Sequence, residues 1–413
     1  MTLYLNIKKL NVNKLKISLV ITLLLLFHAS CTTVAQPKGG SIGVINKDIL
    51  YTNTSTGEIR ALDLDSGEEK YKPSWPSEEE KAIDKKLDKE DQKYRSLAIY
   101  GAPAIWKEDI YIVTYDGYLF KLSLDLIEEW REPIGKITSS NTTFVATPKI
   151  KDGILIIGSS DNTIIAFDVE NRTKKWTFQT NGPVWSSVDI YEDLVYFTSL
   201  DKYVYAIDFT DGSLVWKFKT GGAIVSTPIV NQNKVYVGSF DRILYAIDAK
   251  SGNEIWRFEN AKSWYWGTPI IYEKYIFAPS LDGNLYALER ESGKLLWTTN
   301  TEGKIVGSPV IINDYIVISS TDKKIRLLKL VDGQQIDICN IGDNIKSDII
   351  KNNDLIFFTT EDSIRAIKIK QNGNMTLRQV AERLQLSFAR IKQIETKALS
   401  KIKKHAASLN AFF

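Results

Sequence analysis

A repeat with a period of about 40 residues dominates the sequence. Four stretches align over their whole length: GSSDNTIIAFDVENRTKKW, TSLDKYVYAIDFTDGSLVW, GSFDRILYAIDAKSGNEIW and PSLDGNLYALERESGKLLW. The marker position, an aspartate in all copies but the first, recurs eight times, at Thr56, Asp116, Asp161, Asp201, Asp241, Asp282, Asp322 and Asp362. The gap from the first to the second marker is one repeat plus an insertion. A fixed period of this length predicts a repeat architecture of eight units that bury one another's faces.

Each copy is expected to form four short strands. In the fifth copy, residues 226–230, 234–238, 243–248 and 254–258 alternate or run apolar, with turn-forming residues between them. Glycines recur in the last hairpin, where a left-handed backbone disfavours a Cβ, at Gly67, Gly212, Gly252, Gly293 and Gly333. Four strands per period are typical of a propeller blade. The prediction is an all-β fold: an eight-bladed β-propeller of four-stranded blades over residues 40–375, followed by a short α-helical C-terminal tail.

The tryptophans of the repeat carry a resemblance to a known family. Four are in register, Trp176, Trp216, Trp256 and Trp297, and Trp130 is one residue short of that register. The motif Asp-x-x-x-Tyr-Ala-hydrophobic-Asp…Gly-x-x-x-Trp resembles the pyrroloquinoline-quinone-type repeat. The whole array resembles the BamB-like lipoproteins of outer-membrane protein assembly, which are eight-bladed. Tyr71 and Asp337 depart from the motif at the tryptophan position, as does Leu377 if the eighth copy is complete. The resemblance is more specific for fold than for function.

The first 30 residues have the composition of an export signal. Lysines precede the apolar run 17–27, whose eleven residues would rise only about 16 Å as a helix, well short of the roughly 30 Å hydrocarbon core. Residues 1–30 are therefore predicted to be a signal peptide. Ala-Ser before Cys31 resembles the bacterial lipobox, which implies lipidation of Cys31, although His28 stands where that family prefers leucine. Ordinary cleavage after Ala35 is the alternative.

The net charge of +3 conceals three unlike segments. Residues 1–30 carry four lysines and no acid, residues 376–404 carry a net +6, and the remainder therefore carries −7. An acidic body is poorly suited to polyanions, so nucleic acid is not expected on the ring. Cys31 and Cys339 are too few for a disulfide framework.

The body lacks residues that quinone chemistry would use. The related quinoprotein dehydrogenases hold a Ca²⁺-bound quinone beside a vicinal disulfide, with a catalytic aspartate. This sequence has no Cys-Cys pair, and its two histidines lie in the leader and the tail. The recurring aspartates are interpreted as hairpin residues that accept backbone N–H bonds, because they occupy one place in each copy. We expect no catalytic residue, no metal and no cofactor, and we expect the tryptophans to pack between blades.

Aromatic residues at one position break the repeat. Where the fifth copy has Val225, the sixth has Trp266, preceded by Trp264 and Tyr265, and the fourth has Trp185. These residues precede the innermost strands and are expected at the mouth of the ring. Two interpretations stay open. The rings pack against the neighbouring blade, or they form an exposed platform for a peptide strand or a sugar, since such rings give much contact area for little entropy.

An insertion, residues 72–98, interrupts the first copy. Ser77 followed by three glutamates is typical of a helix N-cap with acids in the first turn, and Ile83 and Leu87 are four residues apart. This pattern predicts a charged surface helix.

Residues 376–413 change the period from two to that of a helix. Two helices with a short turn are predicted, and RIKQIETKAL resembles the helix-turn-helix of bacterial sigma-factor region four. The resemblance implies DNA contacts by Arg390, Lys392 and Gln393, although the two residues before Arg390 replace an Arg-Glu pair that reads bases. A basic amphipathic tail on anionic lipid is the alternative. The repeat register also places the last strand of the eighth copy at 374–380, and one segment cannot form both structures.

The leading functional hypothesis is a non-enzymatic scaffold lipoprotein of the cell envelope. It would be exported, anchored by lipid to the outer membrane facing the periplasm, and would bind outer-membrane assembly proteins as a monomeric ring. Thr32, after the lipidated cysteine, lacks the aspartate associated with inner-membrane retention. One alternative is transcription initiation through the tail, which export argues against. The other is a quinone-dependent dehydrogenase, which the missing site residues oppose.

Overall fold

The computed structural model describes residues 43–53, 59–64, 66–71, 98–135, 143–345, 348–360 and 364–369. All of these belong to one compact unit, Lys38–Phe413. The predicted leader, the helical tail and all of the insertion except Ala98 lie outside the described residues. Cys31, Arg390, Lys392 and Gln393 therefore lie outside them too. Within the described ranges, no helix has the length and apolar character needed to cross a membrane.

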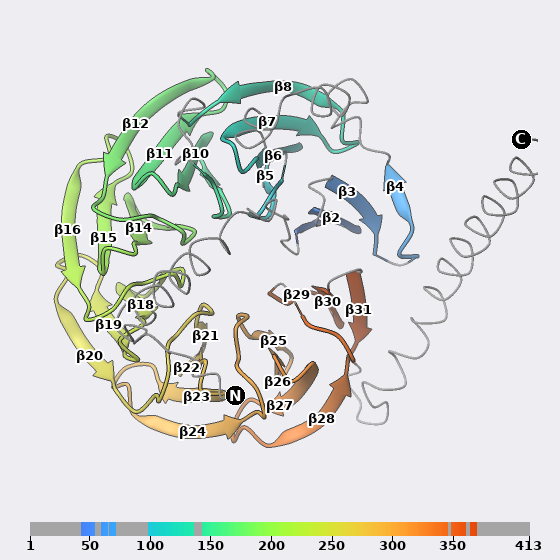
Figure 1. Ribbon diagram of the computed structural model, residues 1–413, viewed down its shortest axis with the longest axis vertical. Coiled ribbons are helices and arrows are strands. Elements are labelled where there is room, and N and C mark those ends of the chain that lie inside the picture. The colour runs from blue at the N-terminus through green and yellow to red at the C-terminus, as the bar shows by residue number, and fades with distance from the viewer. Residues whose placement is uncertain are drawn as a thin grey trace, which may run out of the picture. The chain divides into compact units, whose positions relative to one another are not determined.

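Eight antiparallel sheets follow one another along the chain as blades 1 to 8 (Figure 1). Blade 1 contains β1 (Val44–Asn46), β2 (Ile49–Asn53), β3 (Ile59–Asp63) and β4 (Glu69–Tyr71), and blade 2 contains β5 (Ala104–Trp106), β6 (Asp109–Val113), β7 (Tyr118–Ser123) and β8 (Glu128–Pro133). Blade 3 contains β9 (Lys149–Lys151), β10 (Ile154–Gly158), β11 (Thr163–Asp168) and β12 (Thr173–Gln179), and blade 4 contains β13 (Asp189–Tyr191), β14 (Leu194–Thr198), β15 (Tyr203–Asp208) and β16 (Leu214–Lys219). Blade 5 contains β17 (Ile229–Asn231), β18 (Lys234–Gly238), β19 (Leu244–Asp248) and β20 (Glu254–Phe258), and blade 6 contains β21 (Ile270–Tyr272), β22 (Tyr275–Pro279), β23 (Asn284–Glu289) and β24 (Leu295–Asn300). Blade 7 contains β25 (Val310–Ile312), β26 (Tyr315–Ser320), β27 (Lys324–Lys329) and β28 (Gln335–Asn340), and blade 8 contains β29 (Ile350–Asn352), β30 (Leu355–Thr359) and β31 (Ile364–Lys368).

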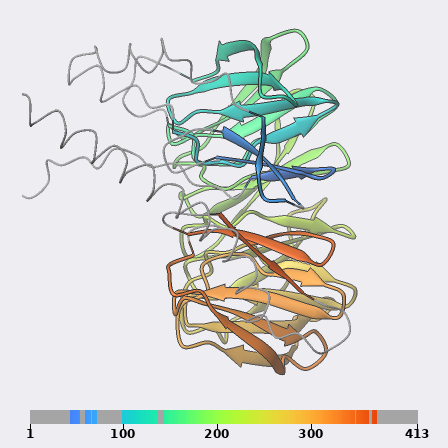
Figure 2. The same cartoon turned by 90° about the vertical axis from the view of Figure 1, so that its right-hand side faces the viewer.

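Within each blade the strands pair in chain order, with the first strand nearest the ring axis and the last on the circumference (Figure 1). Seven blades have four strands, and three are described in blade 8. The segment 374–380, predicted as its fourth strand, lies outside the described residues. Figure 2 shows the same blades after a 90° turn. The predicted fold class, an all-β eight-bladed propeller, is confirmed.

Blade 1 meets blade 8 through side-chain packing. Leu50 and Leu64 of blade 1 lie in one buried cluster with Ile356, Phe358 and Ile367 of blade 8. Each sheet is built from consecutive strands, so no described strand is exchanged between the first and last blades. Apolar burial therefore joins the two ends of the described ring.

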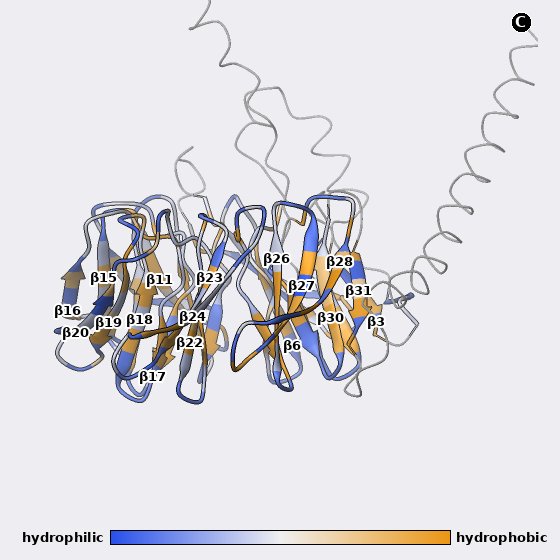
Figure 3. Cartoon of the chain, turned by 90° about the horizontal axis from the view of Figure 1, so that it is seen from below, coloured by the Kyte–Doolittle hydropathy of each residue, from blue (hydrophilic) through white to orange (hydrophobic). Residues whose placement is uncertain are grey.

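The middle strands of each blade hold the core. All six residues of β11 are buried, whereas β24 on the circumference alternates between half-buried and exposed residues. Middle strands are covered on both faces by neighbouring blades, so they read as continuous apolar runs. Figure 3 shows the same division, with apolar residues along the strands and polar residues in the turns.

Hydroxyl groups link neighbouring blades near the axis. The backbone N–H of Thr227 donates to Thr268 Oγ1 (3.3 Å), and that of Thr268 donates to Ser308 Oγ (3.1 Å). Because Thr227 bonds to the next blade in this way, β17 begins only at Ile229, later than the strand 226–230 predicted from the sequence. The other three strands predicted in this copy match β18, β19 and β20 within one residue.

The repeated tryptophans pack between blades, as predicted. Trp216 is 8% exposed, and its Nε1 donates to the carbonyl of Ala249 in the next blade (2.8 Å). A Cβ at Gly252 would lie 2.7 Å from that indole, and Gly252 has φ +73°. The glycine is therefore required both by the left-handed turn and by the close approach of the ring.

Trp130 stands in structural register despite its shorter spacing. It pairs with Lys121 across β7 and β8 as Trp176 pairs with Ala166 across β11 and β12. The missing residue lies in the hairpin turn of blade 2, where the N–H of Ser123 donates to the carbonyl four residues ahead. In blade 4 the corresponding bond spans five residues. A shorter turn thus leaves the inter-blade tryptophan in place.

Candidate partner-binding surface at the ring mouth

One face of the ring is formed by the connections leading into each blade and by the turns between its second and third strands. Antiparallel pairing brings these two kinds of segment to the same end of the sheets. We call this the mouth face. The turns between first and second strands, and between third and fourth strands, lie on the opposite face.

The aspartates of the repeat build the turns of the mouth face. Asp241 Oδ1 accepts the N–H of Ile243 (3.0 Å), and its Oδ2 accepts the N–H of Gly221 (2.7 Å) and the hydroxyl of Tyr245 (2.7 Å). Asp201 and Asp282 make corresponding bonds, with Tyr205 and Tyr286. Each carboxylate thus ties its turn to the connection entering the same blade. The predicted turn-forming role of these aspartates is confirmed.

These contacts shift the pKa of Tyr245 and that of Asp282. Burial, and then the hydrogen bond to Asp241, raises the pKa of Tyr245. Burial alone would raise the pKa of Asp282, but hydrogen bonds from the Lys262 N–H and the Tyr286 hydroxyl hold it below its usual value. The Asp282 carboxylate is therefore ionised and bound within the protein at neutral pH.

Two of the predicted mouth aromatics stack on a third ring. Trp264 and Trp266 are 48% and 43% exposed. The centroid of Phe240, in the turn of blade 5, lies 4.7 Å from that of Trp264 with the planes at 14°, and 5.6 Å from that of Trp266 with the planes at 24°. We call these three residues the aromatic stack. The indoles contact the neighbouring blade and still present a large apolar area to solvent.

Tyr265, predicted as part of the same platform, is instead only 1% exposed. Successive side chains of the extended connection point to opposite sides, so Tyr265 enters the blade interface at the position held by Val184, Ile224 and Ile305 elsewhere. A Cβ at Gly238 would lie 2.3 Å from Tyr265, so that glycine makes room for the ring. Within the described ranges the buried Tyr265 hydroxyl has no hydrogen-bond partner.

Trp185 lies apart from the aromatic stack. It is 41% exposed, and its Nε1 donates to Ser160 Oγ in blade 3 (3.1 Å). Trp185 thus sits at the boundary of blades 3 and 4, whereas the aromatic stack lies at that of blades 5 and 6. Phe240 was not predicted to belong to this surface. Its signal was a phenylalanine directly before a turn aspartate, where other copies have Ser160, Leu200, Leu281 and Thr321.

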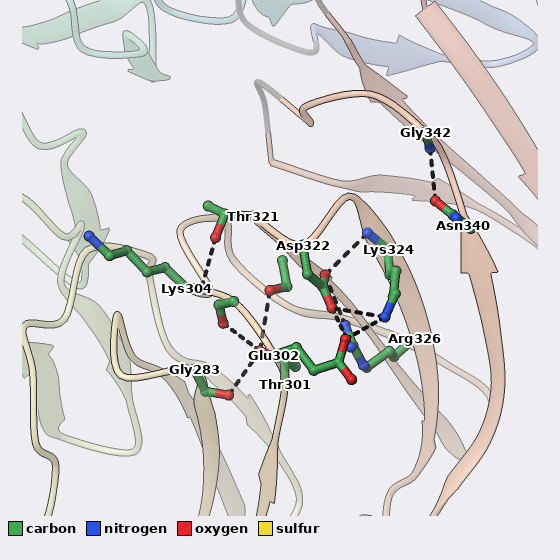
Figure 4. Close-up of polar contacts among 12 residues, drawn as sticks. Gly283, Thr301, Glu302, Lys304, Thr321, Asp322, Lys324, Arg326, Asn340 and Gly342 are labelled. Carbon is green, nitrogen blue, oxygen red and sulfur yellow. Dashed lines mark hydrogen bonds and ion pairs between the residues drawn. The ribbon is translucent and has the colours of Figure 1, made fainter.

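Blade 7 replaces the tyrosine of the turn by arginine (Figure 4). Arg326 Nη1 donates to Asp322 Oδ1 (3.1 Å) and Nη2 donates to Oδ2, with the side chains 4% and 9% exposed. Lys324 Nζ lies 2.5 Å from Glu302 and 3.8 Å from Asp322. Burial alone would raise the pKa of Asp322, but the hydrogen bonds and charge of Arg326 lower it. A buried ion pair here takes the place of the Tyr–Asp hydrogen bond.

Clusters of candidate metal ligands are absent from the described part of the chain, in the sense that no three His, Cys, Asp or Glu side chains are grouped there. Cys339, the only cysteine among the described residues, is buried and not in a disulfide. The expectation that the protein uses no metal and no cofactor stays a prediction.

Two solved structures share the architecture of this chain. No curated protein matches the sequence. The computationally designed protein Ika8 superimposes with a TM-score of 0.67 at 13% identity, over 81% of this chain and 97% of that one. Quinohemoprotein alcohol dehydrogenase ADHIIG from Pseudomonas putida HK5 superimposes with a TM-score of 0.64 at 13% identity, over 80% and 71% of the two chains. BamB from Moraxella catarrhalis gives a TM-score of 0.46 at 17% identity, over 67% and 95%.

A family model assigns the chain more closely. The model described as "Beta-alanine-activating enzyme, beta-propeller" matches residues 137–389, more than half of the sequence. The match extends past residue 375. It therefore includes the segment for which the sequence predicts both the last strand of the eighth copy and the start of the helical tail. With its repeat, its eight blades and this match, the chain belongs to the β-propeller family of the beta-alanine-activating enzyme and is a propeller of the pyrroloquinoline-quinone-like type.

Proposed function

We propose that this protein is a non-enzymatic scaffold of the cell envelope that binds partner proteins through its mouth face. In this proposal residues 1–30 direct export and a lipid on Cys31 holds the ring at the outer membrane, facing the periplasm. The partners are proteins of outer-membrane assembly, as the resemblance of the repeats to BamB-like lipoproteins suggests. The export part rests on the leader sequence, and the binding part rests on the ring.

The observation that carries the binding proposal is the exposed aromatic stack. Large aromatic side chains are enriched among the residues that dominate protein interfaces. Trp264 and Trp266 are already held against Phe240, so binding would cost them little rotamer entropy. Arg242 and Lys262, both exposed, each lie two residues from a member of the stack. Such a surface suits a partner segment that offers apolar and acidic side chains.

A scaffold role also accounts for how the turn carboxylates are used. The aspartates that could serve as general acids or Ca²⁺ ligands accept hydrogen bonds from backbone amides and from tyrosine or arginine side chains. The fold likeness to a quinohemoprotein alcohol dehydrogenase, at 13% identity, concerns architecture only.

Replacing Trp264 and Trp266 together by alanine is expected to weaken partner binding at least thirtyfold, about 2 kcal/mol, since paired hot-spot residues typically contribute that much or more. The measurement is titration of the immobilised ring with its purified envelope partner, identified by crosslinking in intact cells. The control is Ile255→Ala with Leu296→Ala, which removes similarly exposed apolar area (41% and 43%) from the circumference. Equal losses in both double variants, or a lowered melting temperature in the tryptophan variant alone, would contradict the proposal.

Replacing Cys31 by serine is expected to release the protein from the membrane fraction into the soluble envelope fraction. The serine hydroxyl cannot form the thioether that anchors the lipid, and export itself would continue. The measurements are fractionation of both proteins and mass spectrometry of the mature N-terminus. An N-terminus at Gln36, or a wild-type protein found in the cytoplasm, would overturn this part of the proposal and leave mouth-face binding to be judged on its own.

A further inference from the structure

A pocket lies between blades 2 and 3, away from the mouth face. Its volume is about 270 Å³, and its lining includes Trp106, Asp109, Lys121, Glu129, Trp130 and Arg172. Trp106 ends the first strand of blade 2, and Arg172 lies in the turn between the third and fourth strands of blade 3. Both belong to the opposite face of the ring, so this site is separate from the aromatic stack.

The pocket occurs where the repeat departs from its own pattern. At the position of Arg172 the next four blades have glycine, and the backbone keeps the left-handed conformation there, with φ 55°. At the position of Lys121, opposite the repeated tryptophan, blades 3 to 6 have alanine. The two long cationic side chains replace the smallest residues of the repeat, on either side of Trp130. Packing of the tryptophan requires neither Lys121 nor Arg172, because blades 3 to 6 pack their own tryptophans against smaller residues.

The acidic side of the pocket has one carboxylate in excess. Lys121 Nζ lies 2.9 Å from Asp109 Oδ2 and 2.8 Å from Glu129 Oε2, so one ammonium group serves two carboxylates. Burial alone would lower the pKa of Lys121, but its hydrogen bonds to Glu129 and Asp109 outweigh that effect and raise it. This group of three therefore carries a net charge of −1 at neutral pH.

The basic side of the pocket has one cation in excess. The Arg172 guanidinium lies 5.1 Å from the centroid of the Trp130 ring and forms no ion pair with any carboxylate in the described ranges. The remaining charges at the rim balance, because Lys107 Nζ lies 2.7 Å from Glu170 Oε1. Lys107 Nζ also lies 4.1 Å from the ring centroid of Trp106, so this cation makes a cation–π contact with the indole at the rim of the pocket.

We propose that this pocket binds a small zwitterion, a molecule with an amino group and an acid group on a short carbon chain. Its ammonium group faces Asp109 and Glu129, its acid group faces the guanidinium of Arg172, and its hydrocarbon part lies against the indoles of Trp106 and Trp130. Arginine presents paired N–H donors that match a carboxylate, so the acid group is held in a defined orientation. A volume of 270 Å³ is slightly below the range of drug-sized ligands and suits a molecule the size of one amino acid.

The test is calorimetric titration of the full-length protein with unbranched ω-amino acids from glycine to 6-aminohexanoate. Saturable binding is expected for at least one chain length, and at least tenfold weaker binding for the alkylamine and the alkanoate of matching length. Absence of saturable binding by every member up to about 10 mM would overturn the proposal. Equal affinity for the matching alkanoate would also overturn it, because the site would then be a simple anion site.

The repeat itself supplies the variants. Arg172→Gly and Lys121→Ala restore the residues of the other blades, and each is expected to weaken binding of the best zwitterion at least tenfold. Arg172→Gly is expected to keep or raise the melting temperature, since glycine favours the φ of 55° found there. Lys202→Gly is the matched control, because it removes an exposed cation from another left-handed position, φ 77°, and should bind as the wild type does. Unchanged binding by Arg172→Gly would refute the assignment.

Discussion

Replacing Arg326 by methionine is expected to lower the free energy of unfolding of the ring by about 3–5 kcal/mol. The side chains of Arg326 and Asp322 are 4% and 9% exposed, and the guanidinium makes two hydrogen bonds to the carboxylate. Methionine fills much of the same volume but leaves Asp322 in a desolvated site without its cation. Guanidinium-chloride denaturation at pH 7 measures the difference.

Arg326→Tyr is the matched control, because it recreates the hydrogen bond that Tyr205, Tyr245 and Tyr286 make in blades 4 to 6. We expect this variant to lose less than half as much stability as the methionine variant. Equal losses would mean that repacking around residue 326, rather than the unpaired carboxylate, sets the cost.

The same ion pair predicts how acid acts on the ring. Arg326 holds the pKa of Asp322 below its usual value, so the folded state favours the ionised carboxyl. The stabilisation that ionised Asp322 gives the folded state is fully present above the pKa of an aspartate in the unfolded chain, about 3.9. It is lost as the pH falls through the lower pKa of Asp322 in the folded state. In Arg326→Met, burial without the cation favours the neutral carboxyl, so the difference in stability between wild type and this variant should shrink as the pH falls toward the folded-state pKa of wild-type Asp322.

Replacing Gly293 by alanine is expected to lower the free energy of unfolding by about 2–4 kcal/mol. The backbone at Gly293 has φ +70°, where a Cβ costs about 1 kcal/mol. That Cβ would also lie 2.5 Å from Cε3 of Trp256, which is 9% exposed and held by a bond from its Nε1 to the carbonyl of Arg290 (3.1 Å). The ring cannot move aside without breaking that hydrogen bond. Chemical denaturation of the purified protein measures the loss.

Gly67→Ala separates the two parts of this cost. Gly67 has nearly the same φ, +71°, but no heavy atom lies within 4 Å of a Cβ built there. The Gly67 variant should lose only the backbone part, about 1 kcal/mol. If both variants lose the same amount, the contact with Trp256 contributes nothing and the glycines are kept for their backbone conformation alone.

The architecture of the blades could be predicted from the sequence alone. Alternating apolar residues, turn residues and a constant period are local signals, and they suffice to predict four strands per copy and eight copies. The roles of the turn aspartates and of the glycine–tryptophan pairs were also predictable, because a residue that recurs at one place in several copies meets the same environment in each of them. Trp130 did not fit the spacing of the other tryptophans, because it comes one residue early in its copy. The structure shows that the hairpin turn of blade 2 is one residue shorter, so Trp130 takes the same place as the other tryptophans.

The contacts across blade boundaries could be learned only from the tertiary structure. Trp264 and Trp266 lie at the surface against Phe240, while Tyr265 between them is buried, because the connection alternates its side chains between solvent and the adjacent blade. The pocket around Trp130 likewise joins Lys121 to Arg172, two residues of adjacent blades. A repeat pattern tells which residue is unusual in its own copy, but the neighbour of that residue belongs to another copy. Only the packing of adjacent blades brings the two unusual residues into contact with one site.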